Sequence, residues 1–268
     1  MESMIRVAPV RPAAPYLGGK RNLASRLCAI LRGIPHQTYV EPFVGLGGIF
    51  LRRDRRPRAE VINDLSGDVA NLFRILQRHY EAFMGELKWK LTSRAEFDRL
   101  RRADASTLTD LERAARFLYL QRLAFGGKVT GRTFGVGKAT PARFDVTKLE
   151  PMLAEIHERL AGVVIEQLPY ADVIRRYDAA ETLFYLDPPY VDCEDDYGAG
   201  FTPDDFFRMA DQLASIRGRF VLSINDAPLA RAAFGRFDLR GVEVTYTVAK
   251  GIGKRVGELI ISNGTAIS

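Results

Sequence analysis

Short apolar runs that alternate with amphipathic helical patterns constrain the fold of this chain more than any other feature of its sequence. Such runs are typical of strands buried on both faces, and a helical pattern repeats its apolar residues three and four positions apart. The expected strands are 38–43, 60–64, 163–166, 183–186 and 220–224. Strands and helices in alternation form a mostly parallel sheet with helices on both faces, so we expect an α/β protein.

The alternation is interrupted between about 77 and 162 by a mainly helical stretch. The elements predicted there are helices at 94–102, 108–122 and 147–160 and strand fragments at 128–130 and 133–136. An interrupted series of this kind predicts a doubly wound domain that carries a smaller lobe. We expect a discontinuous main domain at 15–76 and 163–264, an inserted lobe at 77–162 and a flexible arm at 1–14. A hairpin between 241–248 and 258–262 is expected to end the sheet.

Composition excludes several classes of protein. The 268 residues are 47% hydrophobic and 27% charged, as in ordinary water-soluble globular proteins. No apolar run is long enough to span a membrane, and no signal peptide begins the chain. Cys28 and Cys193 lie far apart and the three histidines are scattered, so no metal site is expected. The net charge of +6 is compatible with a polyanionic partner without establishing one.

The tetrapeptide Asp187-Pro188-Pro189-Tyr190 follows the predicted strand at 183–186. Ligands of open α/β sheets bind at the carboxyl ends of strands, where this motif places a carboxylate, a rigid carbonyl and an aromatic ring. Pro189 biases Pro188 toward an extended backbone, which gives the Pro188 carbonyl a set direction. Two acceptors and a flat ring suit the exocyclic amino group of a planar base. The alternative is a plain turn that ends a strand.

A glycine loop at 44–48 lies between the predicted strand at 38–43 and a helix expected to begin at about Ile49. Glycines there allow tight turning and a close approach of the backbone to a ligand. The spacing does not match the dinucleotide motif, because Phe50 takes the place of its third glycine, and no phosphate-binding lysine follows. Asp64 follows the next strand, where an acidic residue meets ribose hydroxyls. Together the loop and Asp64 favour a ligand that contains adenosine and lacks a pyrophosphate.

These two motifs give the chain a family resemblance. Asp187-Pro188-Pro189-Tyr190 and Glu41-Pro42-Phe43-Val44-Gly45-Leu46-Gly47-Gly48 resemble the catalytic and cofactor motifs of Dam-like (class D12) DNA N6-adenine methyltransferases, over about 16–261. The resemblance implies a Rossmann-like methyltransferase sheet, S-adenosylmethionine as cofactor, and a small helical lobe that recognises the DNA target. It implies a catalytic role for Asp187, Pro188, Pro189 and Tyr190.

The resemblance also implies which residues bind S-adenosylmethionine. They are Tyr16, Gly18, Gly19, Lys20, Glu41, Pro42, Phe43, Gly45, Gly47, Asp64, Asp172 and Asp187. Asp64 resembles the carboxylate that binds the ribose, and Asp172 resembles the one that meets the adenine of the cofactor. Two features need qualification: the family commonly has Trp at the position of Tyr16, and Asp172 could equally be an acidic residue that stabilises a helix N-terminus.

The resemblance indicates how the motif would act on adenine. An exocyclic aromatic amine is a poor nucleophile because its lone pair is delocalised into the ring. Hydrogen bonds to Asp187 and the Pro188 carbonyl would pull the nitrogen toward tetrahedral geometry and stabilise the positive charge that develops on it. A base inside a duplex cannot reach such a pocket, so the base must flip out, and Tyr190 is expected to stack on it. Related motifs with Ser act on cytosine, whereas Asp favours adenine N6.

A basic stretch at 122–143 occupies the place of the family's target-recognition hairpin. Its predicted DNA-binding residues are Arg122, Phe125, Lys128, Arg132, Lys138 and Arg143. Cations interleaved with aromatic residues and glycines suit phosphate contact and stacking, and Arg132 is the expected base contact. Gln121 and Phe125-Gly126-Gly127 depart from the family pattern, so no target sequence carries over. A solvated basic loop is the alternative for this stretch, and a solvated loop is the expectation for 52–58.

We therefore expect a site-specific methyltransferase that acts on adenine N6 in double-stranded DNA, as a cytoplasmic monomer without a metal or a membrane partner. The resemblance leaves open whether a restriction endonuclease accompanies it in a restriction-modification system. One alternative of the same chemistry is an RNA or protein-amide methyltransferase. Another, from a different class, is a non-catalytic DNA-binding relative, against which the intact Asp187–Tyr190 motif argues.

Overall fold

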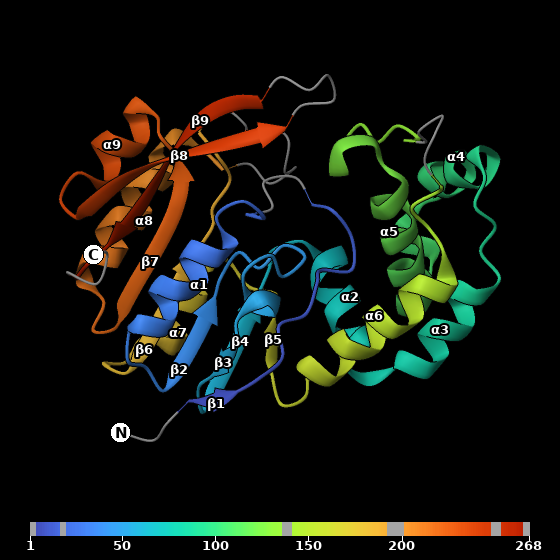
Figure 1. Ribbon diagram of the computed structural model, residues 1–268, viewed down its shortest axis with the longest axis horizontal. Coiled ribbons are helices and arrows are strands. Elements are labelled where there is room, and N and C mark those ends of the chain that lie inside the picture. Colours follow the sequence, from blue (N-terminus) through green and yellow to red (C-terminus); the bar gives the residue numbers. More distant parts are fainter. Residues whose placement is uncertain (1–3, 17–19, 136–140, 192–200, 248–252, 265–268) are drawn as a thin grey trace.

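A single seven-stranded sheet runs through the main part of the protein, in a computed structural model that describes residues 4–16, 20–135, 141–191, 201–247 and 253–264 (Figure 1). The strand order is β5-β4-β2-β6-β7-β9-β8. The first five of these strands are parallel, while β9 is antiparallel to both of its neighbours. The strands are β2 (Thr38–Glu41), β4 (Ala59–Asn63), β5 (Val164–Glu166), β6 (Thr182–Leu186), β7 (Arg219–Asn225), β8 (Asp238–Thr247) and β9 (Gly253–Ser262). The predicted strands and the terminal hairpin are confirmed, within a few residues at their ends.

The order of the strands creates a switch point beside β2. From β2 the chain moves outward to β4 and β5, and then returns to place β6 on the other side of β2. Loops that leave β2 and β6 therefore diverge to opposite faces, which opens a crevice at the carboxyl ends of these strands. The motif after β6 and the glycine loop after β2 both lie at this end of the sheet.

Alternate residues of the strands face two separate apolar cores. In β6, Leu183 and Tyr185 pack on one side, and Phe184 and Leu186 pack on the other. The first side is covered by α1 (Ala24–Gly33) and α2 (Gly67–Arg78), and the second by α7 (Tyr170–Tyr177), α8 (Pro203–Ser215) and α9 (Pro228–Phe234). Because both faces are covered, β6 is buried along its whole length, as its uninterrupted apolar run predicts.

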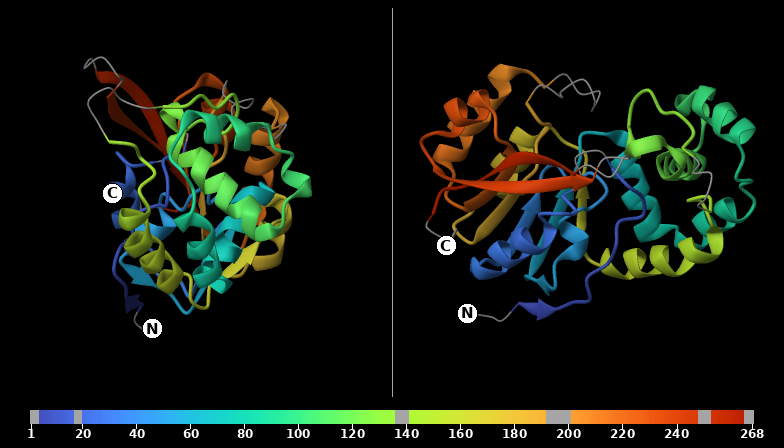
Figure 2. Two further views of the ribbon diagram at one scale, coloured as in Figure 1. Left: turned by 90° about the vertical axis from the view of Figure 1, so that its right-hand side faces the viewer. Right: turned by 45° about the horizontal axis from the view of Figure 1, so that its top comes forward.

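The inserted segment forms a helical lobe at one end of the sheet (Figures 1 and 2). Its helices are α3 (Tyr80–Lys88), α4 (Arg94–Arg102), α5 (Asp110–Leu123) and α6 (Val146–Arg159), with 3-10 turns η2 (Ala105–Thr107) and η3 (Phe125–Gly127). Helix α2 packs against α5 and α6, so the lobe continues the core on the α1 and α2 side of the sheet. The division of the chain at 77 and 162 stays a prediction, and the shared core ties the two parts together.

The structure differs from the sequence-based expectation in the N-terminal arm. Ile5–Arg6 form β1, which pairs antiparallel with β3 (Arg55–Arg56), and the amides of Val7 and Val10 donate to Asp54 O and Leu51 O. Val10, Ala13 and Ala14 are buried in the core. The part of the arm that the structure describes is therefore anchored by a two-stranded ladder and apolar contacts, which its Pro- and Ala-rich sequence did not signal.

Two further local expectations are wrong. The glycine loop leads into a single 3-10 turn, η1 (Phe50–Arg52), because Arg53 already has an extended backbone. Of the fragments at 128–130 and 133–136, only Phe134 forms a bridge, with Ala124, while 128–130 is a loop and Val136 lies outside the described residues. The positive φ of Gly126, Gly127 and Gly131 makes this segment a series of turns.

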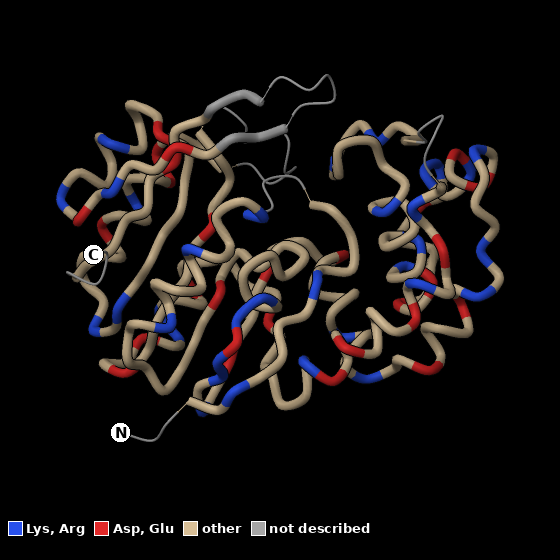
Figure 3. Tube along the Cα trace, viewed as in Figure 1, with Lys and Arg blue, Asp and Glu red and all other residues tan. Residues whose placement is uncertain are grey.

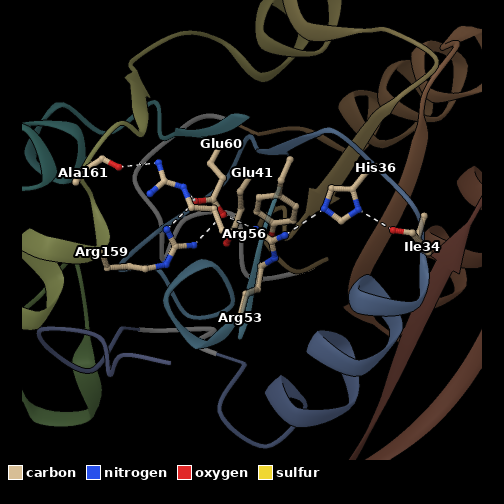
Figure 4. Close-up of polar contacts among 9 residues, drawn as sticks. Ile34, His36, Glu41, Arg53, Arg56, Glu60, Arg159 and Ala161 are labelled. Carbon is tan, nitrogen blue, oxygen red and sulfur yellow. Dashed lines mark hydrogen bonds and ion pairs between the residues drawn. The ribbon is translucent and has the colours of Figure 1, made fainter. Parts of the chain in front are cut away.

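The arginine run at 52–58 is not the solvated loop that was predicted. Arg53 is buried and its guanidinium donates to Glu60 Oε1 at 2.7 Å (Figure 4). Arg159 of α6 reaches the same carboxylate with both terminal nitrogens, at 2.6 and 2.8 Å, and Arg56 Nε lies 3.5 Å from it. Burial of Glu60 on β4 draws these guanidinium groups inward, since an unpaired buried carboxylate would be costly.

Candidate active site

A cavity of about 1150 Å³ lies at the carboxyl ends of β2, β4 and β6. Glu41, Asp64 and Asp187, each at the end of one of these strands, line it. Asn63 holds the strand ends together, because its side chain donates to Pro42 O and Leu168 O and accepts from the Leu168 amide. The switch point of the sheet therefore brings together three carboxylates that are far apart in the sequence.

Asp187 is engaged by a buried lysine. Lys20 Nζ lies 2.9 Å from Asp187 Oδ1 and 3.4 Å from Glu258 Oε2. The lysine ammonium also donates to Tyr190 Oη, and the tyrosine hydroxyl donates to Glu258 Oε1. Exposed fractions are 20% for the side chain of Asp187, 1% for Lys20 and 0% for Glu258. Asp187 and Lys20 both line the cavity, and Asp187 is the more exposed of the two.

Burial sets the protonation behaviour of the carboxylates. It raises the pKa of Asp187 to about 6, although the charge and hydrogen bond of Lys20 lower that pKa. Burial raises the pKa of Glu41 to about 8 even though Tyr39 Oη donates to its Oε2 at 2.7 Å. Glu41 therefore favours its neutral form near pH 7, since desolvation penalises the charge, whereas Asp187 is mostly ionised there beside the ammonium of Lys20.

The glycine loop is held by Asp64. The Gly45 amide donates to Asp64 Oδ2 and the Ser66 amide to Asp64 Oδ1, each at 2.9 Å. Gly45 and Gly47 have φ of 50° and 77°, which other residues rarely adopt, and a Cβ on Gly45 would lie 3.1 Å from the ring of Tyr16. Tyr16 therefore packs directly on the loop, at the place where the sequence led us to expect an aromatic contact with the cofactor.

Aromatic side chains form the end of the cavity near β5. Ring centroids of Phe43 and Tyr170 are 5.4 Å apart, and those of Tyr170 and Phe201 are 6.0 Å apart. Asp172 is not among the lining residues; it lies in the first turn of α7 and binds Arg175 at 2.7 Å. The geometry therefore favours the helix-stabilising alternative, because the side chain of Asp172 is 44% exposed and paired with Arg175 of the same helix. Asp205, at the start of α8, lines the cavity in its place.

The predicted DNA-binding stretch presents only some of its side chains to solvent. Phe125 is 56% exposed, and Lys128 and Arg143 are also exposed. Arg132 points inward: it donates to Gln121 Oε1 at 3.1 Å and to Lys128 O at 3.3 Å. Arg122 donates to Ala13 O and Arg143 O and lines the cavity. Figure 3 shows acidic and basic residues interspersed along the lobe helices.

Several predicted residues lie outside the described part of the chain, namely Gly18, Gly19 and Lys138. Sequence reasoning missed Glu258, a lone carboxylate at the start of the apolar run 259–261. A single carboxylate next to an apolar strand was the signal in the sequence that could have identified Glu258 as a buried charged residue. Asn225, the last residue of β7, accepts from the Val191 amide and donates to Val191 O, which holds the chain just after the Asp187–Tyr190 motif.

Within the described residues, no helix is long and apolar enough to cross a membrane. Over the same ranges, no group of His, Cys, Asp and Glu side chains could hold a metal ion.

A doubly wound α/β sheet carries the glycine loop after β2 and the Asp-Pro-Pro-Tyr motif after β6, and both line one cavity. This is the arrangement that the resemblance to amino-methyltransferases implied. The chain belongs to the D12 class N6 adenine-specific DNA methyltransferase family, whose sequence profile matches residues 16–248. It is therefore an adenine-specific DNA methyltransferase, as the resemblance implied.

Individual relatives are similar over nearly the whole chain. Type II methyltransferase M1.LlaDCHI of Lactococcus lactis subsp. cremoris is 26% identical over 95% of each chain. The DNA adenine methylase of Vibrio cholerae serotype O1 is 28% identical over 91% of this chain and 93% of its own. The DNA adenine methylase of Escherichia coli K12 is 27% identical over 91% of this chain and 92% of its own.

Proposed function

We propose that the protein methylates adenine N6 in double-stranded DNA with S-adenosylmethionine as the methyl donor, and that the target base leaves the duplex to reach Asp187. The observation that carries this proposal is the position of Asp187. Its carboxylate is the partly exposed member of a buried charged cluster, and it opens into the cavity that the glycine loop also lines.

The residues that line the cavity fit S-adenosylmethionine, which supplies a methyl group on a positively charged sulfur. Phe43, Tyr170 and Phe201 offer aromatic surface for an adenine ring. Asp64 has one acceptor site left on each oxygen for ribose hydroxyls, since each oxygen already accepts one backbone amide. Glu41 is a buried carboxylate whose raised pKa would fall next to a cation. The cavity thus supplies acidic groups for a cationic ligand.

Asp187 and the Pro188 carbonyl act on the target amine. They accept hydrogen bonds from its two N–H groups, favour a tetrahedral nitrogen and stabilise the positive charge that develops there. Positioning supplies the remaining rate enhancement, because the amine is held in line with the methyl group. Tyr190 has its hydroxyl fixed by Glu258 and Lys20, which would hold its ring in one orientation beside the flipped base.

Methylation assays test this proposal directly. The purified protein should transfer methyl groups from S-adenosylmethionine to plasmid DNA, with N6-methyladenine located by long-read sequencing. RNA and protein tested in parallel should remain unmodified. Asp187→Ala should reduce methylation at least about 100-fold, as expected when an electrostatic contact to the reacting group is lost, while cofactor binding measured by calorimetry stays within a few-fold. Near-normal turnover of Asp187→Ala would refute the catalytic assignment.

A further inference from the structure

We propose that Glu258 is a positioning residue that receives the ammonium group of Lys20 when the amino group of the target adenine replaces that ammonium on Asp187. The inference rests on the proposed role of Asp187 as the acceptor for adenine N6. It assigns a function to a strand, β9, on which the sequence predicted no site residue.

The geometry creates the need for such a residue. Lys20 Nζ lies 2.9 Å from Asp187 Oδ1, so the carboxylate that is to stabilise positive charge on the target amine already has a cation as its counter-ion. Glu258 Oε2 lies 3.4 Å from the same ammonium, so a small shift toward Glu258 would release Asp187 without leaving the ammonium unpaired. Lys20 is 1% exposed and Glu258 is 0% exposed, and a buried charge that loses its partner is strongly destabilising.

Charge balance during the reaction points to the same role. As the methyl group moves, positive charge passes from the donor to the adenine nitrogen, beside Asp187. The ammonium of Lys20 would oppose that charge if Asp187 were its sole counter-ion. A second carboxylate on Lys20 leaves the Asp187, Lys20 and Glu258 cluster with one net negative charge, which favours the transition state. Tyr190, which bonds to both Lys20 and Glu258, connects this cluster to the catalytic motif.

The titratable groups around Asp187 come from three strands, the segment after β6 and the segment before α1. They are Lys20, Glu41 on β2, Tyr185 on β6, Tyr190 after β6 and Glu258 on β9. Lys20 lowers the pKa of Asp187, whereas the charge of Glu258 raises it. Removing the charge of Lys20 should therefore raise the pKa of Asp187, and removing the charge of Glu258 should lower it. A general loss of structure would not shift this pKa in opposite directions.

Three variants and a control test the inference. Glu258→Gln keeps an acceptor but removes the charge, and Lys20→Met keeps the length of the side chain but removes the ammonium. The double variant combines them. Glu243→Gln is the matched control, because Glu243 is a solvent-exposed glutamate on β8 of the same hairpin. Each protein is assayed for kcat at saturating DNA and S-adenosylmethionine from pH 5 to pH 9, after its thermal unfolding has been measured.

We expect Glu258→Gln to lower kcat about tenfold or more, since one charge that favours the transition state is lost, while Glu243→Gln matches wild type. The acid limb of the pH profile should shift to lower pH in Glu258→Gln and by about one unit to higher pH in Lys20→Met. The double variant should turn over within about twofold of Lys20→Met, because Glu258 acts through the lysine. Three results would each overturn the inference. They are an equal kcat in Glu258→Gln and Glu243→Gln, shifts of the acid limb in the same direction in Glu258→Gln and Lys20→Met, and a loss of kcat in the double variant equal to the two single losses combined.

A measurement without catalysis separates this inference from the proposed function. The pKa of the Asp187 carboxyl can be followed by ¹³C NMR in the cofactor-free protein, with the signal assigned by Asp187→Asn. Opposite shifts of the Asp187 pKa in Glu258→Gln and Lys20→Met would support the charged cluster. An active Asp187→Ala protein would reject only the proposed function and would leave this result standing. An unmoved Asp187 pKa in both variants would reject the cluster, whatever the activity.

Discussion

Glu41 shows how a single buried carboxylate couples ligand binding to pH. It is fully buried at the end of β2, and burial raises its pKa from 4.5 to about 8. Between these two pH values the folded protein holds a proton that the unfolded chain has released. The free energy of unfolding therefore falls as pH rises through this window.

We predict that Glu41→Gln removes this loss of stability. Urea denaturation of the cofactor-free protein at pH 5 and pH 8 measures the free energy of unfolding. Its decrease between these pH values should be smaller in the variant than in wild type by roughly 2–4 kcal/mol. Asp64 and Asp187, whose pKa values burial raises to about 6, contribute equally in both proteins, so the difference reports Glu41. Equal pH dependence in the two proteins would show that Glu41 is charged without a ligand.

Asp64 combines a structural and a ligand-binding role at one residue. Because it accepts the amides of Gly45 and Ser66, its removal loosens the glycine loop and also takes away the expected ribose acceptor. Asp64→Ala should weaken S-adenosylmethionine binding by roughly 1–3 kcal/mol, measured by calorimetry. Asp172→Ala, at a position that does not line the cavity, is the control and should bind the cofactor like wild type. An unchanged dissociation constant for Asp64→Ala would refute the ribose role.

At the scale of an element, the basic stretch after α5 is organised around Gln121. The buried amide of Gln121 donates to Pro15 O at 2.8 Å and Gly127 O at 2.6 Å and accepts from Arg132. It therefore joins the recognition lobe to the residue that precedes Tyr16. Gln121, which departs from the family pattern, therefore ties Gly127 and Arg132 of the basic stretch to Pro15.

These contacts separate the roles of Lys128 and Arg132. Lys128→Ala should weaken binding to all DNA sequences alike, because Lys128 is exposed and free to contact phosphates. The salt dependence of DNA binding should fall by about one counterion. Arg132→Ala should cost about 1–2 kcal/mol of stability in urea denaturation, because two hydrogen bonds are lost. A stable Arg132→Ala variant with altered site preference would instead support the base contact expected from the sequence.

At the scale of the whole molecule, one buried carboxylate fastens the lobe to the sheet. Glu60 on β4 binds Arg53 after η1, Arg56 on β3 and Arg159 on α6, while Arg56 also donates to Ala161 O (Figure 4). Arg53 and Arg159 lie 3.6 and 4.1 Å from the ring centroids of Tyr39 and Phe50, which help to accommodate the excess positive charge. His36 accepts from Arg53, and burial lowers the pKa of His36 to about 4, so it stays neutral there.

Glu60→Gln should lower the free energy of unfolding by roughly 3–5 kcal/mol, because the buried guanidinium groups of Arg53 and Arg159 lose their counter-ion. Urea denaturation at pH 7 measures the loss. Glu158→Gln, an exposed glutamate beside Arg159 on α6, should change stability by less than about 0.5 kcal/mol. A Glu60→Gln protein as stable as the Glu158→Gln control would show that apolar contacts alone attach the lobe.

Sequence by itself determined the elements of the sheet and the residues at its strand ends. Apolar runs located the central strands such as β6, because a strand buried on both faces needs a continuous apolar run. The sequence also placed Asp64 and Asp187 at carboxyl ends of strands, where the cavity lies, while Glu41 came from the family resemblance. These features depend on short-range patterns, which a single sequence contains.

Tertiary structure decided which charged groups meet. Lys20 and Glu258 are 238 residues apart and come together only because β9 inserts beside β7. The inward turn of Arg53 and Arg132 and the outward position of Asp172 depend on the partners that packing supplies. Local periodicity sets the face on which a side chain lies, whereas the energy of a charge depends on burial and on counter-ions from distant segments, and only the folded chain provides these.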